Sequence, residues 1–439
     1  MSILIKQPLI LTMEWENGRL NPPFRGDILV EGDKIIRIGG SSPLEYNAYA
    51  QVIDGRRLLA MPGLINAHNH AAMTLFRGFG DDMALMDWLK NKIWPVEAKM
   101  TAKDILTGTR LAVLEMIKSG TVAFADMYGF CEQVAQAVAE AGCRASICWG
   151  IMDPTPKEGE KQLRQGLDFA LLNQNTCEGR ITAMLGPHAP YTCTPKFLTQ
   201  VAQLGREHQL PLHIHVHETQ DELAQIAARD GCRPIDLLKR CDFFSENKVI
   251  AAHGVWLNED DIVKLDDHDV SVVHCPASNL KLASGLAPVM SLLAAGLNVA
   301  LGTDSACSNN NLDLFEEMKL AALTAKLRGL DPLALPAATA LQMATINGAK
   351  ALGLADCGLL AVGQKADIIL INIDQPHFTP QHDLISHLVY AARGSDVDTV
   401  MVAGRLLMQK RVLQTLDEER IIYEAEQIAQ DLCYIRSKK

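Results

Sequence analysis

Several features that direct a chain to a membrane or a disulfide scaffold are missing from this sequence of 439 residues. No C-x-x-C pair occurs among its eleven cysteines, which lie scattered from Cys131 to Cys433 and predict free thiols in a reducing compartment. No apolar run approaches the roughly 20 residues of a bilayer span. The first residues lack the basic start and the cleavage site of a signal peptide. We therefore expect a cytoplasmic protein.

Clusters of positive charge are also absent. No run of five basic residues occurs, and 41 basic against 52 acidic residues give a net charge of -11. Because phosphate binding needs clustered Lys and Arg, this balance argues against a nucleic acid or an anionic membrane as partner. Hydrophobic residues make up 48% and charged residues 21%, which is typical of a globular protein.

The two ends of the chain have the pattern of β-strands. Residues 2–12, 27–38 and 51–60 are apolar runs joined by tight turns without a helix, which indicates a small antiparallel sheet. Strand patterns return late in the chain, at 358–360, 366–370, 397–402 and 405–408. We expect residues 1–61 and 358–412 to form one composite β-sandwich domain, followed by a C-terminal helix within 413–439.

Between these ends, helical stretches alternate with short apolar runs. Such alternation predicts βα units around a parallel sheet, and eight units close a barrel of about 250 residues. The fold class is therefore α/β, with a (β/α)8 TIM-like barrel over residues 62–357. The apolar runs after the first strand are 121–125, 144–149, 181–185, 212–216, 249–252, 270–273 and 297–301.

Histidines stand at the ends of two of these strands. His68 and His70 lie two residues apart in Asn66-Ala67-His68-Asn69-His70, so both can face the mouth of a barrel. The run His213-Ile214-His215-Val216-His217-Glu218 adds a third imidazole, His215, and a carboxylate three residues later. Imidazole is a common ligand for a metal such as zinc. For His213 and His217, a structural role in packing is the more frequent alternative to a role in the site.

Two further strands end in polar groups. His253 follows the apolar run 249–252, and Asp304 follows 297–301. Each residue alone is compatible with a structural role, such as a helix cap. Active sites of βα barrels lie at the carboxyl ends of the strands, and so many ligand-type residues at strand ends indicate a metal-dependent active site there.

The successive motifs MPGLINAHNH, GPHAPYTCT, HIHVHET, AAHGVWL, HCPASNLKLASG and LGTDSACSNNNLD resemble those of the amidohydrolase superfamily. More narrowly, they resemble the 5-methylthioadenosine/S-adenosylhomocysteine deaminases and their triazine-hydrolase relatives. The resemblance covers nearly the whole chain, including the late element Gly363-Gln364-Lys365-Ala366-Asp367. It implies a hydrolase of small molecules that often forms homo-oligomers.

The resemblance implies a role for each strand-end residue. His68, His70, His215 and Asp304 would hold one divalent ion, Zn²⁺ or in some relatives Fe²⁺, which lowers the pKa of bound water towards about 7. Three residues would be catalytic: His253 would orient the attacking hydroxide, Asp304 would accept its proton, and Glu218 would protonate the substrate ring. The stretch Ile181–Gly186 lacks the lysine that bridges two metals in some members, which favours one ion.

Substrate contacts follow from the same resemblance. Glu97, after Trp94-Pro95-Val96, is similar to a glutamate that accepts hydrogen bonds from two ribose hydroxyls. His188 is similar to a ligand-binding imidazole, and Trp88 is a candidate for stacking on a purine. Glu218 and Asp304 would also touch the substrate.

One position departs from the resemblance. Members that accept S-adenosylhomocysteine present arginines after the third barrel strand, where this chain has Trp149, followed by Lys157 and Arg164 in an expected loop. The sequence thus favours 5′-methylthioadenosine or adenosine as substrate and weakens the case for S-adenosylhomocysteine. Hydrolysis of another aminated or halogenated ring, such as guanine, cytosine or an s-triazine, is the alternative. A non-catalytic scaffold is disfavoured because all four metal ligands are present.

Overall fold

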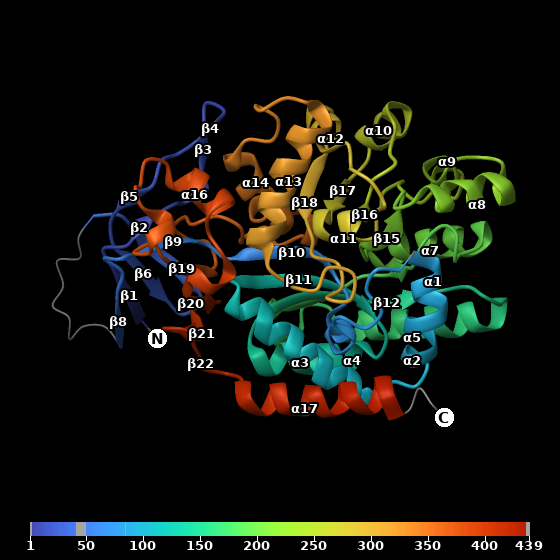
Figure 1. The fold of residues 1–439 in the computed structure, drawn as a ribbon, viewed down its shortest axis with the longest axis horizontal. Helices are drawn as coiled ribbons and strands as arrows, with labels where there is room; N and C mark the ends of the chain where they lie inside the picture. The colour runs from blue at the N-terminus through green and yellow to red at the C-terminus, as the bar shows by residue number, and fades with distance from the viewer. Residues whose placement is uncertain (1, 41–49, 84, 436–439) are drawn as a thin grey trace.

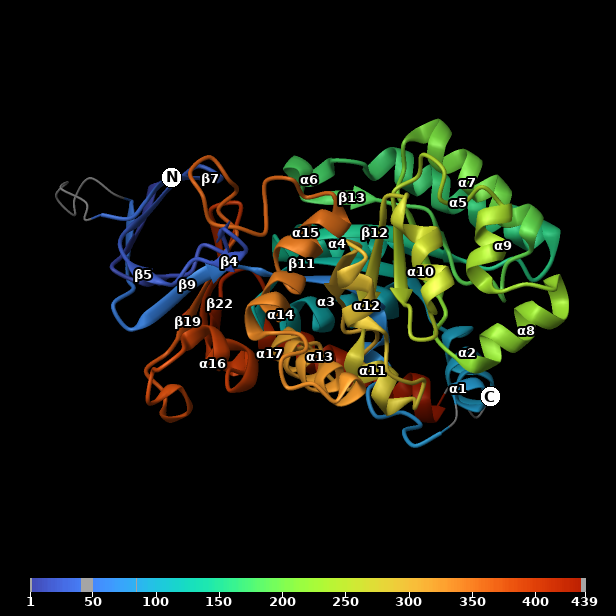
Figure 2. The ribbon, with the colours of Figure 1, turned by 90° about the horizontal axis from the view of Figure 1, so that it is seen from above.

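A computed structural model describes residues 2–40, 50–83 and 85–435 of the chain. Its helices and strands divide into a region of short strands from both ends of the chain and a region of alternating strands and helices (Figure 1). Figure 2 shows the two regions side by side, with the early and late strands of the chain intermingled in the first. Among the helices of the described residues, none combines the length and apolar composition that a membrane span requires.

The first region contains a seven-stranded sheet in the order β22-β21-β20-β19-β9-β2-β5. Strands from both ends of the chain meet in it, because β9 pairs with β19 in antiparallel register. The bounds are Leu9–Ile10 (β2), Phe24–Arg25 (β5), Leu58–Pro62 (β9), Ile368–Asn372 (β19), Val397–Val402 (β20), Arg405–Gln409 (β21) and Val412–Leu413 (β22).

A second sheet of this region has the order β7-β6-β1-β8 and comes only from the start of the chain. Its strands are Ser2–Lys6 (β1), Ile28–Glu31 (β6), Lys34–Ile38 (β7) and Gln51–Asp54 (β8), and a separate hairpin joins Trp15–Glu16 (β3) to Arg19–Leu20 (β4). One apolar cluster joins residues of both sheets, among them Ile3, Ile10 and Ile368. The late strands therefore share buried surface with the early ones.

Three details of the expected strands were wrong. Residues 2–12 form two strands instead of one, because Gln7 takes a φ of +55° just before Pro8. The early strands are not purely antiparallel, since β1 pairs with β8 and β2 with β9 in parallel register. Residues 358–360 form no strand, and Gly358 there has a φ of +86°.

The second region holds two sheets of parallel strands, in the orders β10-β11-β12-β13 and β15-β16-β17-β18. A parallel bridge between Leu185 and Leu212 links the sheets, and the backbone N–H of Asp304, after β18, donates to the carbonyl of His68 in β10. The bounds are Leu64–Asn69 (β10), Thr121–Tyr128 (β11), Arg144–Ile151 (β12), Ile181–Ala183 (β13), Gly186–Pro187 (β14), Leu212–Val216 (β15), Val249–His253 (β16), Val270–His274 (β17) and Asn298–Leu301 (β18). Because neighbouring strands are parallel, their carboxyl ends meet at one edge.

The helices of this region follow the strands as the alternation predicted. In α4, Val134, Val138 and Ala141 form an apolar stripe at helical spacing that is buried, and Gly142 ends the helix with a φ of +88°. The bounds of these helices are Ala102–Lys118 (α3), Cys131–Ala141 (α4), Pro156–Asn173 (α5), Thr176–Gly179 (α6), Pro195–His208 (α7), Gln220–Asp230 (α8), Pro234–Arg240 (α9), Glu259–Asp266 (α10), Pro276–Lys281 (α11), Val289–Ala294 (α12), Leu314–Gly329 (α13), Ala337–Met343 (α14) and Ile346–Leu352 (α15).

Two segments complete the fold. Short helical turns after β10 precede α3, and the late part of the chain ends in a longer helix, α17, which packs against α3 (Figure 1). The bounds are Ala71–Phe76 (η2), Leu85–Trp88 (α1), Leu89–Ile93 (η3), Trp94–Glu97 (α2), Pro376–Phe378 (η4), Leu384–Tyr390 (α16), Gly394–Asp396 (η5), Glu418–Gln430 (α17) and Asp431–Ile435 (η6). The expected C-terminal helix is thus present.

Candidate active site

Four predicted ligands converge at the carboxyl ends of β10, β15 and β18. The Nε2 atoms of His70 and His215 lie 3.2 Å apart. The Oδ1 atom of Asp304 lies 3.5 Å from Nε2 of His68 and 3.3 Å from Nε2 of His70. His68, His70 and His215 each offer a ligand atom within 4.8 Å of the others, as do His68, His253 and Asp304. We call His68, His70, His215 and Asp304 the His/Asp cluster.

Outer hydrogen bonds orient two of these rings. Nδ1 of His70 donates to the carbonyl of Met127 at 2.5 Å, and Nδ1 of His215 donates to the carbonyl of His188 at 2.7 Å. A carbonyl only accepts, so each Nδ1 carries a hydrogen and a neutral ring then presents a lone pair at Nε2. Nε2 of His68 is buried without a hydrogen-bond partner in the described residues. This set of inward-facing acceptors fits a divalent cation.

The charges within the cluster support the same interpretation. Burial lowers the pKa of His68 to about 4. Burial acts in the same direction on His70, but the hydrogen bond and the charge of Asp304 outweigh it and raise the pKa of His70 to about 9. The histidines hold the pKa of the Asp304 carboxyl well below its usual range although burial raises it. The buried carboxylate therefore draws a positive charge into the cluster.

Two serines that the sequence did not single out hold Asp304. Its Oδ2 atom accepts hydrogen bonds from the hydroxyls of Ser278, at 2.6 Å, and Ser308, at 2.9 Å. Asp304 has a φ of +58°, so the chain turns as it leaves β18. With Oδ2 satisfied in this way, Oδ1 is the oxygen that faces the histidines.

Glu218 and His253 lie beside the cluster as predicted. Nε2 of His253 is 3.9 Å from Oε2 of Glu218, and Nδ1 of His253 contacts Oδ1 of Asn279 at 3.0 Å. Burial raises the pKa of Glu218, so its carboxyl holds a proton to higher pH than a solvated one. The carboxylate of Glu222 accepts the backbone N–H groups of His217, at 3.0 Å, and Glu218, at 2.9 Å, and thereby holds this turn.

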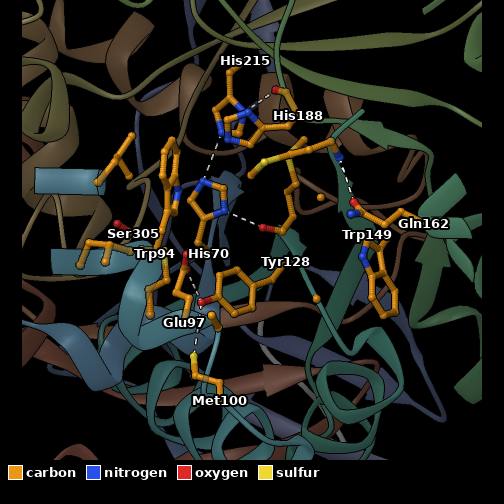
Figure 3. A pocket seen from close by; sticks show the side chains of 18 of the residues that line it. His70, Trp94, Glu97, Met100, Tyr128, Trp149, Gln162, His188, His215 and Ser305 are labelled. Atoms are coloured by element: carbon orange, nitrogen blue, oxygen red, sulfur yellow. Dashed lines mark hydrogen bonds between the residues drawn. The ribbon is translucent and has the colours of Figure 1, made fainter. Parts of the chain in front are cut away.

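The cluster opens onto a pocket of about 920 Å³. The predicted contact residues Glu97, His188 and Trp88 all line it, and Figure 3 shows His70, His188 and His215 at one end with Glu97 and Tyr128 near them. The hydroxyl of Tyr128 donates to Oε1 of Glu97, and burial raises the pKa of Glu97. Tyr128 is a residue that the sequence analysis missed.

Two of these predicted contact residues have polar neighbours of their own. Nδ1 of His188 lies 3.0 Å from the hydroxyl of Thr192, and Nε1 of Trp88 lies 3.4 Å from the carbonyl of Phe79. Trp88 is only 5% exposed, so most of its ring packs in the core and one part lines the pocket.

Away from the cluster, the pocket is bounded by β12 and α5. Trp149 lies there with its ring centroid 6.3 Å from that of Phe130. The sequence expectation for the following segment was wrong, because Lys157 and Arg164 belong to α5 and not to a loop. Of the basic residues on α5 that are described, it is Lys161 that lines the pocket.

Of the three histidines of this segment, His215 lines the pocket, whereas His213 and His217 contact other parts of the protein. His217 has a φ of +57°, and its Nδ1 contacts the carbonyl of Trp256 at 3.1 Å. His213 contacts His68 from behind, with Nε2 of His213 at 2.9 Å from Nδ1 of His68. The three histidines do not share one face, because the chain turns at His217.

Comparisons with known proteins agree with this geometry. The model of the amidohydrolase family matches residues 59–407, which contain the whole His/Asp cluster. This chain belongs to the amidohydrolase family. Among curated amidohydrolase relatives, it is 50% identical to a 5-methylthioadenosine/S-adenosylhomocysteine deaminase of Pelotomaculum thermopropionicum, over 98% of both chains. It is 48% identical to a 5′-deoxyadenosine deaminase of Methanosarcina mazei, again over 98% of both chains.

Solved structures give the same result for the fold. An adenosine deaminase from Xanthomonas campestris with bound zinc superposes with a TM-score of 0.91 at 34% identity, over 98% of each chain. The atrazine chlorohydrolase of Arthrobacter aurescens, complexed with zinc, superposes with a TM-score of 0.88 at 25% identity, over 97% of this chain and 100% of that one. The amidohydrolase fold therefore extends along nearly the whole chain.

Proposed function

We propose that this amidohydrolase is a metal-dependent deaminase of adenine nucleosides. It would convert the 6-amino group of 5′-methylthioadenosine, 5′-deoxyadenosine or adenosine into the oxygen of the inosine analogue and release ammonia. The observation that carries the proposal is that His70, His215 and Asp304 of the His/Asp cluster line one pocket with Glu218, Glu97 and His188. The names of the relatives at 48–50% identity support the same reaction.

The proposed cofactor is one divalent ion per chain, Zn²⁺ in the first place and Fe²⁺ as the alternative. His68, His70, His215 and Asp304 would hold it, and the inward-facing Nε2 atoms fit this role. Both solved relatives described above contain bound zinc. When bound, the ion would supply the Lewis acidity that makes water nucleophilic at neutral pH.

Different side chains around the cluster would carry out the separate proton transfers of the reaction. As the oxygen of water bonds to the ring carbon that bears the amino group, Asp304 receives the proton of the water. Glu218, whose pKa burial raises, gives its proton to the adjacent ring nitrogen. His253 hydrogen-bonds the incoming oxygen with Nε2. Asp304 then passes its proton to the amino group, the carbon–nitrogen bond breaks and ammonia leaves. The proton of the new hydroxyl returns to Glu218 as the ring carbonyl forms.

The rest of the pocket would recognise the nucleoside. Tyr128 occupies Oε1 of Glu97, which leaves Oε2 as an acceptor for the ribose hydroxyls. His188 and Trp88 would contact the purine. Trp149 suits a short apolar 5′ substituent, whereas Lys161 is a basic group that the carboxylate of an amino-acid tail such as that of S-adenosylhomocysteine would meet.

The domain and assembly predictions complete the proposal. Residues 62–357 would form a closed (β/α)8 barrel, which the contact between His68 and the chain after β18 supports. Residues 1–61 and 358–412 would form a composite β-sandwich domain, with the helix of 413–439 outside it. The enzyme would act in the cytoplasm as a homo-oligomer, without nucleic-acid or membrane partners.

A panel of substrates tests this proposal on the zinc-loaded protein. The ultraviolet shift from adenine to hypoxanthine is followed for methylthioadenosine, 5′-deoxyadenosine, adenosine, S-adenosylhomocysteine and free adenine, with guanine, cytosine and an aminotriazine for comparison. Turnover of the nucleosides without free adenine supports the proposal. If only guanine, cytosine or the aminotriazine is turned over, the protein is still a hydrolase but its substrate is not an adenine nucleoside.

A further inference from the structure

Behind the His/Asp cluster lies a chain of buried contacts that does not reach the pocket. Nδ1 of His68 contacts Nε2 of His213 at 2.9 Å, and Nδ1 of His213 contacts Sγ of Cys148 at 3.8 Å. Cys148 in turn lies 3.5 Å from the backbone carbonyl of Asp126. His68, His213 and Cys148 are all fully buried, so no bulk water competes for these contacts.

One set of donor directions in this chain leaves Nε2 of His68 free for a metal ion. In it, the thiol of Cys148 donates to the carbonyl of Asp126 and presents its sulfur as a weak acceptor. His213 then donates from Nδ1 to the sulfur, and as a neutral ring it accepts at Nε2. His68 therefore donates from Nδ1 and has its lone pair at Nε2, the atom that faces Asp304.

We propose that His213 is a positioning residue that, together with Cys148, holds His68 in the tautomer needed for a metal ligand. The proposal rests on the proposed metal site. His70 and His215 receive the same orientation from backbone carbonyls, the usual partner of the second nitrogen of a ligand histidine. For His68, the side chain of His213 stands where the carbonyl stands for the other two.

The opposite tautomer of His68 has two costs. Its Nε2 would carry a hydrogen that points at the cluster, where a cation would sit. Its Nδ1 would then face Nε2 of His213 with two lone pairs 2.9 Å apart, unless His213 also changed its tautomer and the thiol of Cys148 donated to His213 in place of the carbonyl of Asp126. The positions of the hydrogens on His68, His213 and Cys148, which we call the relay, therefore depend on one another.

Zinc affinity, measured by competition with a chromophoric chelator, tests this role without any reference to turnover. His213→Leu removes the acceptor at constant burial and should weaken zinc binding by about 10- to 100-fold. His213→Gln restores an acceptor oxygen near the position of Nε2 and should regain most of that loss. The matched control is His217→Leu, a buried histidine of the same segment whose ring contacts Trp256 and not His68, and it should keep the affinity of the unaltered protein.

The end of the relay has its own pair of variants. Cys148→Ala removes the acceptor for His213, and Cys143→Ala removes another buried thiol just before the same strand, β12. We expect weaker zinc binding only from Cys148→Ala, by a factor of about three because sulfur is a weak acceptor. Equal zinc affinity in His213→Leu and the unaltered protein would overturn the proposal.

A measurement on the unaltered protein covers the case in which a variant fails to fold. Nitrogen-15 NMR of histidine-labelled protein, with and without zinc, distinguishes a protonated Nδ1 from a protonated Nε2 in each ring. The proposal predicts a protonated Nδ1 in both His68 and His213, and a protonated Nε2 in His213 contradicts it. His68→Ala separates the two proposals, because unchanged zinc affinity in that variant refutes the metal site itself.

Discussion

The Nε2 atoms of His70 and His215 lie 3.2 Å apart, although the carbonyls that orient both rings leave these atoms as acceptors. In two neutral rings the facing lone pairs would repel each other, and without a metal ion a proton on His70, whose pKa is raised to about 9, relieves this repulsion. A metal ion would replace that proton, so the folded protein should bind one and gain stability from it.

Zinc should therefore raise the midpoint of thermal unfolding of chelator-treated protein. A ligand that binds only the folded chain stabilises it by about 2.7 kcal/mol at a concentration a hundred times its dissociation constant. Scanning calorimetry measures the shift, with His215→Ala expected to lose it. The exposed His208 on α7 provides a matched control, since His208→Ala should respond to zinc as the unaltered protein does. An equal shift in both variants argues against His215 as a ligand.

Glu218 should give the activity a limb that falls with rising pH. Burial raises the pKa of this carboxyl, so the acid form persists above its ordinary range and is lost as the pH rises through the raised value. Glu218→Gln should lower kcat by about 10²- to 10⁴-fold and remove this limb. Glu207→Gln, an exposed substitution of the same kind, is the control. A pH profile of kcat that keeps its alkaline limb in Glu218→Gln would assign the proton to another group.

Glu222 should make stability depend on pH. Burial raises its pKa from 4.5 to about 7, so between these values the folded chain holds a proton that the unfolded chain has lost. The free energy of unfolding therefore falls as the pH rises through this window, by up to about 3 kcal/mol from this group. Because Glu222→Gln cannot ionise, its free energy of unfolding relative to the unaltered protein should be higher at pH 8 than at pH 5, as measured by urea unfolding. If this difference in the free energy of unfolding is the same at both pH values, the prediction is wrong.

Glu97 should discriminate substrates by their ribose hydroxyls. Loss of a hydrogen bond to a charged group costs about 1.5–3 kcal/mol, which is roughly 10- to 100-fold in kcat/KM. Glu97→Gln should therefore narrow the preference for adenosine over 2′,3′-dideoxyadenosine. Tyr128→Phe, which removes the hydroxyl that holds Oε1, should do so to a smaller extent. The role fails if the preference is the same in all three proteins.

Lys161 should decide whether S-adenosylhomocysteine is accepted. Among the described basic residues of α5, Lys161 is the one that lines the pocket, so a carboxylate on the 5′ substituent would lie near it. Lys161→Ala should raise KM for S-adenosylhomocysteine by about tenfold, the value of a modest ion pair, and leave methylthioadenosine unchanged. Lys157→Ala on the same helix is the matched control. A parallel change for both substrates would point to a structural role of Lys161.

The sequence was most informative where chemistry and strand pattern coincide. His68, His215 and Asp304 could be predicted because a polar group at the end of an apolar strand is conspicuous, and the structure brings them together. Their supports could not be predicted in the same way. Ser278 reaches Asp304 from α11, and Ser308 lies only four residues after Asp304. Both serines stand inside the motifs that carry the family resemblance, but the pattern alone does not show that their hydroxyls bind Asp304.

Errors arose where one backbone angle or one helix boundary decides the outcome. Strict alternation along a strand would put His217 on the same face as His213 and His215, but a φ of +57° turns it away. Lys161 was overlooked because its position depends on where α5 begins, and Pro156 starts that helix with Thr155 as its cap. Such features depend on tertiary contacts that a hydrophobic pattern does not contain.

Release of ammonia is the most direct test of the central claim. Methylthioadenosine is incubated with zinc-loaded protein and, in parallel, with His215→Ala, and ammonia is measured beside the product of the ring. The account predicts one ammonia for each adenine ring converted to hypoxanthine, and little of either from the variant. Zinc-loaded protein that releases no ammonia from methylthioadenosine, 5′-deoxyadenosine or adenosine would contradict it.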